Sequence, residues 1–438
     1  MATAYPVSVQ LGKESAFGSP DSSGPGVDIS GLTLWSAEVE RASVNHFGDP
    51  VLNEDGTASN GFGGRPPEMS TAWDGSARVK RAQGEITLVS QARAFGSGHS
   101  SMTDAADYWQ VFVPRSVMHY FDSAGGTLTP SGAPANAGEI ELGSALTEGE
   151  VVMVTQASGV VEAFLCTDWD GTTTATVAPY ASTAIGASTP VHRGINLSVP
   201  TGANSGTKGA SLVGKVSSLK GTTTFTGGRL ARQRIYSENG RVMVEHTIRC
   251  AYVDTDISSA GTVVEPARTG GVVIHHHQSG HAFSTNAAPQ DADAGWTSAR
   301  TSLATIERDS LEIVFEFGLE EIGDVDGAPF MADMEVGMVT VTASLRTRSP
   351  ITAIRNDLRD GVVRLWSFAF GPITDGSSTN QGLAVIIPGG FLTADPSIID
   401  RSGAIVEQQI QIRAGDFGGC DGANTEANAM AYIYMGGT

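Results

Sequence analysis

Hydrophobic and polar residues alternate with a period of two along several parts of this chain. In "SLEIVFEFGL", residues 310–319, the apolar set on one side is Leu311, Ile313, Phe315, Phe317 and Leu319, and the intervening set is Glu312, Val314 and Glu316. The stretches "AIVEQQIQIRA", "GRVMVEHTIRCAYV" and "EVGMVTVTASLRTR" follow the same rule. Successive side chains of a strand point to opposite faces, so these patterns predict antiparallel strands with one buried face and one wet face.

Turn signals separate the alternating stretches. Asp-Gly and Asn-Gly pairs accept positive φ at low cost and favour tight hairpins. They fall at residues 55–56, 60–61, 74–75, 170–171, 239–240, 326–327, 360–361, 375–376 and 421–422. Short strands between dense turns predict a mainly β fold, an antiparallel β-sandwich or barrel.

Two helices are expected to interrupt the strands. "SPITAIRNDLRDG" offers Ser349 as N-cap, Pro350 as the first helical residue and a stop at residues 360–361. "SMTDAADYWQVF" begins near Ser101 and predicts a second helix. This helix should end before Pro114, because the residue before a proline avoids helical geometry.

Two segments differ from the rest of the chain. Residues 45–80, which include Asp55, Gly56, Asn60 and Gly61, have no periodic pattern, and so long a loop in a compact domain is usually functional or disordered. Residues 126–210 are rich in Gly, Ala, Ser and Thr. They predict either a β module inserted into a domain of residues 1–125 and 211–438, or a pair of extended hairpins belonging to one sheet.

Composition narrows the functional classes. Apolar residues make up 40% of the 438 residues and charged residues 17%, with 54 glycines, as in a globular protein rich in turns. The formal charge of −20 repels phosphate and argues against ordinary nucleic-acid binding, although not against a protein that lets DNA pass without sticking. The sequence shows no signal peptide and no membrane-spanning apolar run, so we expect a soluble chain made in a cytoplasm, without a membrane partner.

Motifs with chemical function are incomplete. The three cysteines, Cys166, Cys250 and Cys420, are too widely spaced for a zinc site and give no disulfide framework. "GASLVGKV", residues 209–216, has Val216 where a phosphate-binding loop needs a hydroxyl, and "DVDGAPFMADME" has Pro329 where a calcium loop needs glycine. No nucleophile motif appears, so we expect no enzyme activity and no cofactor.

The stretch "VVIHHHQSGHAF" contains four histidines, His275, His276, His277 and His281. On a strand, His275 and His277 share a face while His276 points away. A metal site would therefore need ligands from elsewhere in the chain or from a second subunit. The pattern favours neutral histidines at the surface or at a subunit contact over a metal site.

The N-terminal stretch "VSVQLGKESAFGSP" resembles the first segment of tail tube (major tail) proteins of long-tailed bacteriophages. The residues that carry the resemblance are Gly12, Lys13, Glu14, Phe17, Gly18 and Pro20. The stretch "GLAVIIPGGFLTADPSIIDRSGAIVEQQIQIRAGDF" is similar to the C-terminal part of that family. The resemblance covers residues 1–40 and 220–438, and residues 126–210 have no counterpart in the minimal fold.

This resemblance implies that an early strand leads into a Gly-Lys-Glu turn and that subunits form hexameric rings. Rings would stack into a tube in the virion tail, in contact with other tail proteins, and genomic DNA would pass through the lumen. Gly12, Lys13, Glu14 and Phe17 would then belong to an arm, and residues 55–61 to a loop, that contact neighbouring subunits. The chain would be made in the cytoplasm of the host bacterium.

The wet face of "SLEIVFEFGL" supplies candidates for the lumen wall. Glu312 and Glu316 lie on one face of the expected strand. Carboxylates that face the lumen would hold DNA off the wall, but solvated carboxylates on the outer surface fit the same pattern. A capsid-decorating or receptor- or glycan-binding virion protein is the alternative function, and a glycan binder should show clustered aromatic residues. The six tryptophans are scattered, which favours the tube.

Overall fold

The computed structural model describes residues 7–14, 34–47, 83–95, 108–121, 126–132, 134, 136–187, 189–199, 209–219, 221–256, 270–276, 279–285, 299–303, 306–307, 309–323, 331–348, 351–372, 382–396, 399–400, 407–415 and 429–436. These residues form mainly antiparallel β-sheet with two helices, as the alternation and turn signals predict.

The larger sheet has 20 strands among the described residues. They are β1 (Val7–Lys13), β2 (Trp35–Ala37), β3 (Arg41–Phe47), β4 (Gln83–Gln91), β5 (Arg93–Phe95), β6 (His119–Phe121), β13 (Ile195–Ser198), β14 (Leu212–Ser218), β15 (Gly221–Glu238), β16 (Arg241–Asp256), β17 (Gly270–His275), β18 (Ala282–Ser284), β19 (Arg300–Ser302), β20 (Glu312–Gly323), β21 (Met331–Thr347), β22 (Val363–Pro372), β23 (Leu383–Leu392), β24 (Ile399–Asp400), β25 (Glu407–Ala414) and β26 (Tyr432–Met435).

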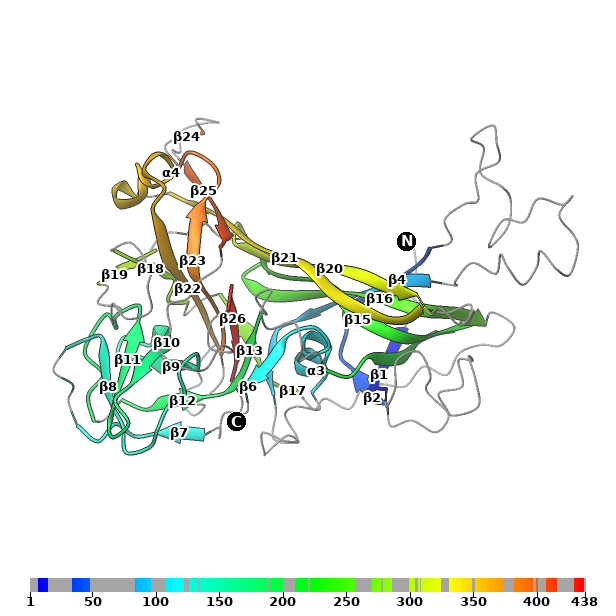
Figure 1. Cartoon of the computed structure of the whole chain (residues 1–438), viewed down its shortest axis with the longest axis horizontal. Coiled ribbons are helices and arrows are strands. Elements are labelled where there is room, and N and C mark those ends of the chain that lie inside the picture. Colours follow the sequence, from blue (N-terminus) through cyan, green and yellow to red (C-terminus); the bar gives the residue numbers. More distant parts are fainter. Residues whose placement is uncertain are drawn as a thin grey trace, which may run out of the picture.

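A second sheet of six strands comes from one continuous part of the sequence. Its strands are β7 (Gly126–Leu128), β8 (Glu139–Glu141), β9 (Val151–Thr155), β10 (Val161–Trp169), β11 (Thr174–Ala178) and β12 (Val191–Arg193). Figure 1 shows it as a compact group at one end of the molecule. β13, which follows directly, pairs with β26 and β6 of the larger sheet.

The helices differ from those the sequence predicts, and residues 101–107 of the one expected near Ser101 lie outside the described residues. Helix α3 (Trp109–Arg115) contains Pro114, so the expectation that it ends before this proline is wrong. The helix tolerates the missing N–H because its residues from Trp109 to Pro114 are buried. The helix predicted after Ser349 is instead a 3₁₀ turn, η2 (Thr352–Ile354), followed by helix α4 (Asp357–Asp360). Helix α4 ends at Gly361, whose φ is 64°.

Seven strands of the larger sheet form a broad platform in the order β3–β4–β16–β15–β20–β21–β25. Further pairings of β25 with β23, β23 with β22, β22 with β17 and β17 with β16 close a circuit of strands around an apolar interior. Helix α3 packs beside β15, below the platform in Figure 1. We call the seven strands of the platform, β3, β4, β16, β15, β20, β21 and β25, the long sheet.

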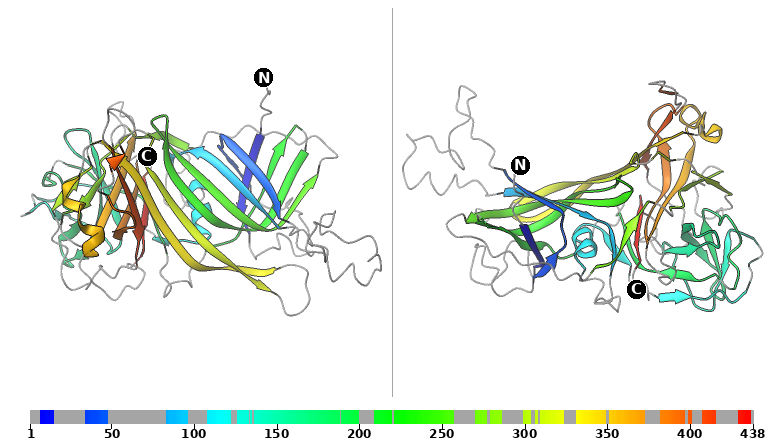
Figure 2. Two further views of the ribbon diagram at one scale, coloured as in Figure 1. Left: turned by 90° about the horizontal axis from the view of Figure 1, so that it is seen from above. Right: turned by 180° about the vertical axis from the view of Figure 1, so that it is seen from behind.

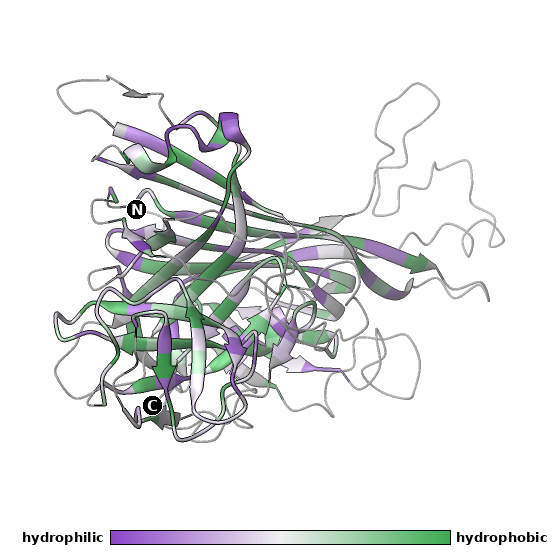
Figure 3. Cartoon of the chain, turned by 60° about the vertical axis from the view of Figure 1, so that its left-hand side comes forward, coloured by the Kyte–Doolittle hydropathy of each residue, from purple (hydrophilic) through white to green (hydrophobic). Residues whose placement is uncertain are grey.

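The hairpin of β15 and β16 lies in the middle of the long sheet. Its turn is the Asn239-Gly240 pair, with φ of 53° and 76°, as the turn signal predicts. The register sets Arg234 opposite Glu245 and Ile235 opposite Val244. One face of the hairpin is therefore apolar and the other polar. Figure 3 shows that hydrophobic and hydrophilic residues alternate along strands of the molecule.

The two sheets share an apolar contact. It is formed by Val151, Met153, Val161, Ala163, Leu165 and Ala178 from the six-stranded sheet and by Leu365, Ala369, Ala384, Ile386, Ala429, Tyr432 and Tyr434 from the larger one. The six-stranded sheet also has an apolar cluster of its own, which includes Phe164 and Val177. Residues 126–193 thus form a distinct sheet that is packed on the rest of the chain.

The N-terminal strand β1 is integrated into the larger sheet. It pairs with β14 on one side and β2 on the other, and Gly12 and Lys13 are its last two residues, opposite Val213 and Leu212. The Gly-Lys-Glu turn implied by the resemblance is therefore wrong. The carboxylate of Glu14 is buried and accepts hydrogen bonds from the Ser211 hydroxyl (2.5 Å) and the Gly227 N–H (2.8 Å), which fixes the end of the strand.

His246 makes the stability of this fold sensitive to acid. Its ring is fully buried on β16, 5.6 Å from the Trp109 ring, and burial lowers the pKa of His246 to about 3. The unfolded chain, in which this pKa is about 6.5, binds the proton first as the pH falls. The free energy of unfolding should therefore decrease by about 2 kcal/mol between pH 7 and pH 5 through this one residue.

Chemical unfolding followed by tryptophan fluorescence at pH 7 and pH 5 checks this prediction. His246→Leu should reduce the difference between the two pH values by about the same 2 kcal/mol, because leucine has no proton to bind. An unchanged difference would show that His246 is not the residue responsible. His276 and His281, whose pKa values burial also lowers, add to the pH dependence of both proteins.

Candidate functional site

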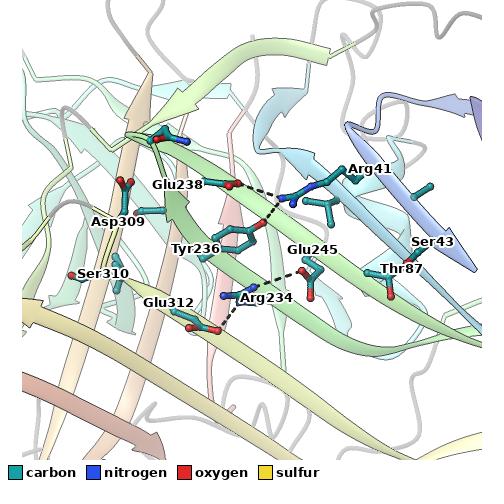
Figure 4. A pocket seen from close by; sticks show the side chains of 15 residues that line it. Arg41, Ser43, Thr87, Arg234, Tyr236, Glu238, Glu245, Asp309, Ser310 and Glu312 are labelled. Atoms are coloured by element: carbon teal, nitrogen blue, oxygen red, sulfur yellow. Dashed lines mark hydrogen bonds and ion pairs between the residues drawn. The ribbon is translucent and has the colours of Figure 1, made fainter. Parts of the chain in front are cut away.

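A groove of about 620 Å³ opens on the polar face of the long sheet. The strands β3, β4, β15, β16 and β20 supply most of its wall, and the segment before β20 supplies the rest (Figure 4). The lining residues are Arg41, Ala42, Ser43, Thr87, Val89, Arg234, Tyr236, Ser237, Glu238, Asn239, Glu245, Asp309, Ser310, Leu311 and Glu312. Four of them are acidic and two are arginines, so the groove has an excess of negative charge.

The groove arises from period-two alternation on β15. Arg232, Arg234, Tyr236 and Glu238 occupy alternate positions of the strand and are only partly buried, whereas the intervening Gln233, Ile235 and Ser237 are buried. On the neighbouring strands, Glu245 of β16 and Glu312 of β20 lie on the same polar face. The register thus brings the charged side chains of three strands together.

Arg234 is at the centre of this network. Its Nε donates to Glu312 Oε1 at 2.6 Å, and its Nη1 lies 3.7 Å from Glu245 Oε2. Its guanidinium carbon lies 4.2 Å from the centroid of the Tyr236 ring. Burial acts to lower the pKa of Arg234, but the hydrogen bond and charge of Glu312 outweigh this and raise it, so the arginine stays charged.

Tyr236 connects this centre to strand β3. The Nη2 of Arg41 donates to the Tyr236 hydroxyl at 3.2 Å and lies 3.4 Å from Glu238 Oε2. Burial raises the pKa of Tyr236, so its hydroxyl is neutral at physiological pH. The Tyr236 ring stacks on Arg234, and its hydroxyl accepts a hydrogen bond from Arg41. These contacts link β15 to β3 across the floor of the groove (Figure 4).

The two carboxylates singled out from the sequence lie on this polar face. Glu312 is bound to Arg234, and Glu316 lies 3.7 Å from Arg232, with 60% of the Glu316 side chain exposed. Both glutamates therefore have an arginine neighbour in the same chain, and their charge is partly balanced. Exposed pairs of this kind contribute about 0–1 kcal/mol each, so they can exchange partners at little cost.

A second hollow of about 330 Å³ continues the groove across the sheet. Glu312 lines both hollows, and the second one adds residues from β21 and β25, namely Thr342, Ser344 and Gln411 among others. These three side chains are polar, and Val314, Ala343 and Ile412 add apolar lining. Together the two hollows form a mainly polar surface that runs over the middle of the long sheet.

This surface is suited to contact with polar partners. The described residues that line it include no histidine or cysteine. Its hydroxyls, carboxylates and guanidinium groups can donate and accept hydrogen bonds over a wide area. Across the described part of the chain, no group of three or more His, Cys, Asp or Glu side chains is arranged to hold a metal ion.

The histidine-rich stretch forms a buried pair. The Nε2 atoms of His276 and His281 lie 2.8 Å apart, and both rings contact Phe370. The expectation of histidines at the surface or at a subunit contact is wrong for His281, which is buried; His276 is partly exposed, and His277 lies outside the described residues. Burial lowers the pKa of both His276 and His281, so the pair is neutral and shares one hydrogen bond.

The residues expected in an inter-subunit arm and loop are only partly described. Gly12, Lys13 and Glu14 lie within or directly after β1, inside the sheet of their own subunit. Phe17, Asp55, Gly56, Asn60 and Gly61 lie outside the described residues. The contact of these segments with a neighbouring subunit stays a prediction.

Sequence analysis missed the basic half of the groove. Arg232, Arg234 and Tyr236 are spaced by two in "ARQRIYSE", which follows the same alternation as the acidic strand. That spacing indicates a wet face, but it does not identify the strand that lies beside it. Only the register of β15 with β20 brings Arg234 to Glu312.

Comparisons with known proteins leave the family open. No protein-family model matches this chain, and no curated protein matches it significantly. None of the helices in the described residues is long and apolar enough to cross a membrane.

Proposed function

We propose that this chain is a structural subunit of a bacteriophage tail tube, in which hexameric rings stack and conduct DNA during ejection. The observation that carries the proposal is the set of open strand edges in the long sheet, namely the outer edge of β3 and the edges of β20 after Glu316 and of β21 before Thr342. Among the described residues these edges pair with no further strand, although they belong to well-formed strands. Such edges readily accept a strand from another copy.

The hairpin of β20 and β21 supplies the longest of these edges. β20 pairs with β15 only from Glu312 to Glu316, and β21 pairs with β25 only from Thr342 to Thr347. Beyond these residues the two strands pair only with each other, up to Gly323 and Met331. At the other side of the long sheet, β3 pairs with β4. A ring could join one subunit's edge to the next.

The polar groove supports a channel on the inside of such a ring. If the long sheets are joined edge to edge, their polar faces form a continuous surface, and the groove contributes Glu312 and Glu238 to it. A wall with an excess of carboxylates gives DNA few phosphate contacts, which lets the genome pass without sequence-specific binding. We therefore retain Glu312 and Glu316 as lumen-facing residues in this proposal.

The remaining parts of the proposal follow from this role. The subunit's partners are further copies of itself, other tail proteins and the DNA in transit, and its location is the virion tail after synthesis in the host cytoplasm. We propose no enzyme activity and no cofactor. A capsid-decorating or glycan-binding virion protein is the second candidate, because the groove includes Tyr236 among hydroxyl and carboxylate groups of the kind that bind sugars.

Self-assembly is the first prediction of the proposal. The purified chain should form rings or tubes, because pairing of the exposed strand edges satisfies backbone groups that otherwise face water. Negative-stain electron microscopy and light scattering over a range of protein concentration and ionic strength measure this directly. A persistent monomer under all these conditions would count against a tube and favour a protein that binds as a single unit.

Reversal of charge on the polar face of the long sheet, at Glu312 in the groove and at Glu316 beside it, tests the lumen assignment. Particles that carry Glu312→Lys with Glu316→Lys should assemble, because exposed ion pairs contribute little to folding. They should eject DNA more slowly than wild-type particles, because the lysines attract phosphate, and most slowly at low salt, where the Debye length exceeds about 8 Å. Release of DNA from purified particles, followed with a fluorescent dye, measures the rate.

Glu141→Lys with Glu148→Lys is the matched control for this experiment. It makes the same change of charge on or beside the six-stranded sheet, away from the groove. Normal ejection by the control and slow ejection by the groove variant would support a lumen-facing groove. If particles with Glu312→Lys and Glu316→Lys assemble normally and eject DNA at the wild-type rate, the lumen assignment is wrong.

A further inference from the structure

We infer that the histidine pair His276 and His281 controls how firmly the six-stranded sheet is attached to the larger sheet, and that protons loosen this attachment. The pair lies beside a buried ion pair that joins the two sheets. We call Glu162, His276, Gly280, His281 and Arg300 together the seam. The inference goes beyond the proposed function, because it concerns a single subunit and does not require assembly.

The ion pair of the seam connects the two sheets. Glu162 lies on β10 and Arg300 on β19, their side chains are 3% and 4% exposed, and Arg300 Nη2 lies 3.3 Å from Glu162 Oε1. Glu162 Oε2 accepts hydrogen bonds from Gln156 Nε2 at 2.8 Å and from the Ser182 N–H at 3.2 Å, which fixes the carboxylate within the part of the chain that forms the six-stranded sheet. Because both charges are buried, their separation would leave each one without compensation.

The backbones of the two parts are in direct contact at the seam. The Gly280 N–H donates to the Ala369 carbonyl oxygen of β22 at 3.0 Å, and Ser279 forms a parallel β-bridge with Val161 of β10. A Cβ at Gly280 would collide with the Val161 carbonyl oxygen. Figures 1 and 2 show from several sides that the six-stranded sheet lies beside β22. Because the seam is tightly packed and its charges are buried, water reaches them only when the two parts separate.

The histidine pair adjoins this contact, since His281 directly follows Gly280. Burial lowers the pKa of both rings, and the neighbouring His276 and Arg300 lower the pKa of His281 further. Asp309 acts in the opposite direction on the pKa of His276, but burial outweighs it. Among the described residues, Arg300 and Asp309 are the charged groups that act on the pair. The pair is therefore neutral while the seam is closed.

Arg300 is sensitive to a second positive charge because its contacts are incomplete. Among the described residues, the Nε and Nη1 of Arg300 and the Nδ1 of His281 have no hydrogen-bond partner. The guanidinium therefore depends on its single contact with Glu162 for compensation of its charge. A proton on the histidine pair would add repulsion at short range in surroundings of low dielectric constant, where such repulsion is strong. Protonation and a closed seam thus disfavour each other.

This opposition makes the attachment dependent on pH. When the seam opens, water surrounds both rings, and each pKa returns toward about 6.5. The open state then binds protons that the closed state excludes, so the closed state loses stability as the pH falls through about 6.5. Between pH 7.5 and pH 5.5, each histidine whose proton is excluded should raise the equilibrium constant for opening by about tenfold.

Thiol labelling of the full chain measures this opening. Ala163→Cys places a thiol in the buried apolar contact between the two sheets, where a reagent reaches it only when the contact opens. The native Cys250, buried in the main core, reports unfolding of the whole chain in the same sample. A dipyridyl disulfide labels thiols at both pH values, each rate is divided by that of the denatured chain at the same pH, and peptide mass spectrometry assigns the label. Labelling of the introduced thiol should rise by about tenfold or more from pH 7.5 to pH 5.5 and should exceed that of Cys250 at both.

Variants of the Ala163→Cys chain identify the residues responsible. His276→Gln with His281→Gln has no imidazole to protonate and should remove the rise. His276→Gln alone, at a partly exposed position, should reduce the rise, and it decides the matter if the double variant does not fold. Glu162→Gln leaves Arg300 without its counter-ion, so labelling should increase by about tenfold or more already at pH 7.5. Circular dichroism checks that each variant is folded.

His246→Leu is the matched control, because it removes a buried histidine of β16 and leaves the seam intact. It should keep the rise in labelling of the introduced thiol. The inference is overturned if this labelling is equal at the two pH values, or if the rise is unchanged in the glutamine variants that fold. It is also overturned if the introduced thiol and Cys250 are labelled at the same rate, since the two sheets then separate only when the whole chain unfolds.

Discussion

The register of β15 against β16 is the constraint on which both faces of the long sheet depend. With two residues of positive φ at Asn239 and Gly240, the hairpin turn fixes Arg234 opposite Glu245 and Ile235 opposite Val244. A slip of one residue would turn the charged side chains of one strand into the core and its apolar side chains into water. The apolar interior and the polar groove are therefore two consequences of one pairing, and neither can change alone.

Polar groups in the interior of the protein and polar groups on the groove face have different roles, because water reaches only the groove face. The buried Glu150 binds Arg193 at 2.6 and 2.7 Å, and the buried Asp357 binds Arg364; loss of either partner would leave a buried charge without compensation. These pairs fix the six-stranded sheet and the segment of helix α4. The pairs of the groove are partly or fully exposed and contribute less to folding. The groove can thus rearrange around a partner while the fold stays intact.

The sequence predicted the strands and the Asn239-Gly240 hairpin, since alternation and turn chemistry are local properties. It also placed Glu312 and Glu316 on a wet face. It did not reveal Arg232 and Arg234 as their neighbours, because strand order depends on contacts far apart in the chain. The Gly-Lys-Glu turn was wrong because the partners of Glu14, Ser211 and Gly227, lie about 200 residues away in sequence. Helix α3 continues through Pro114 because burial of its side chains outweighs one lost hydrogen bond.

The net charge of the subunits limits the kinds of contact that can drive their assembly. Subunits with a formal charge of −20 repel one another over distances set by the Debye length, about 8 Å at physiological ionic strength. Association therefore has to come from short-range contacts, such as the pairing of open strand edges, that can outweigh the repulsion. Salt weakens the long-range repulsion more than it weakens contacts from which water is excluded. Because the negative charge keeps free subunits apart, a few local surfaces must set the direction and spacing of the subunits in an assembly.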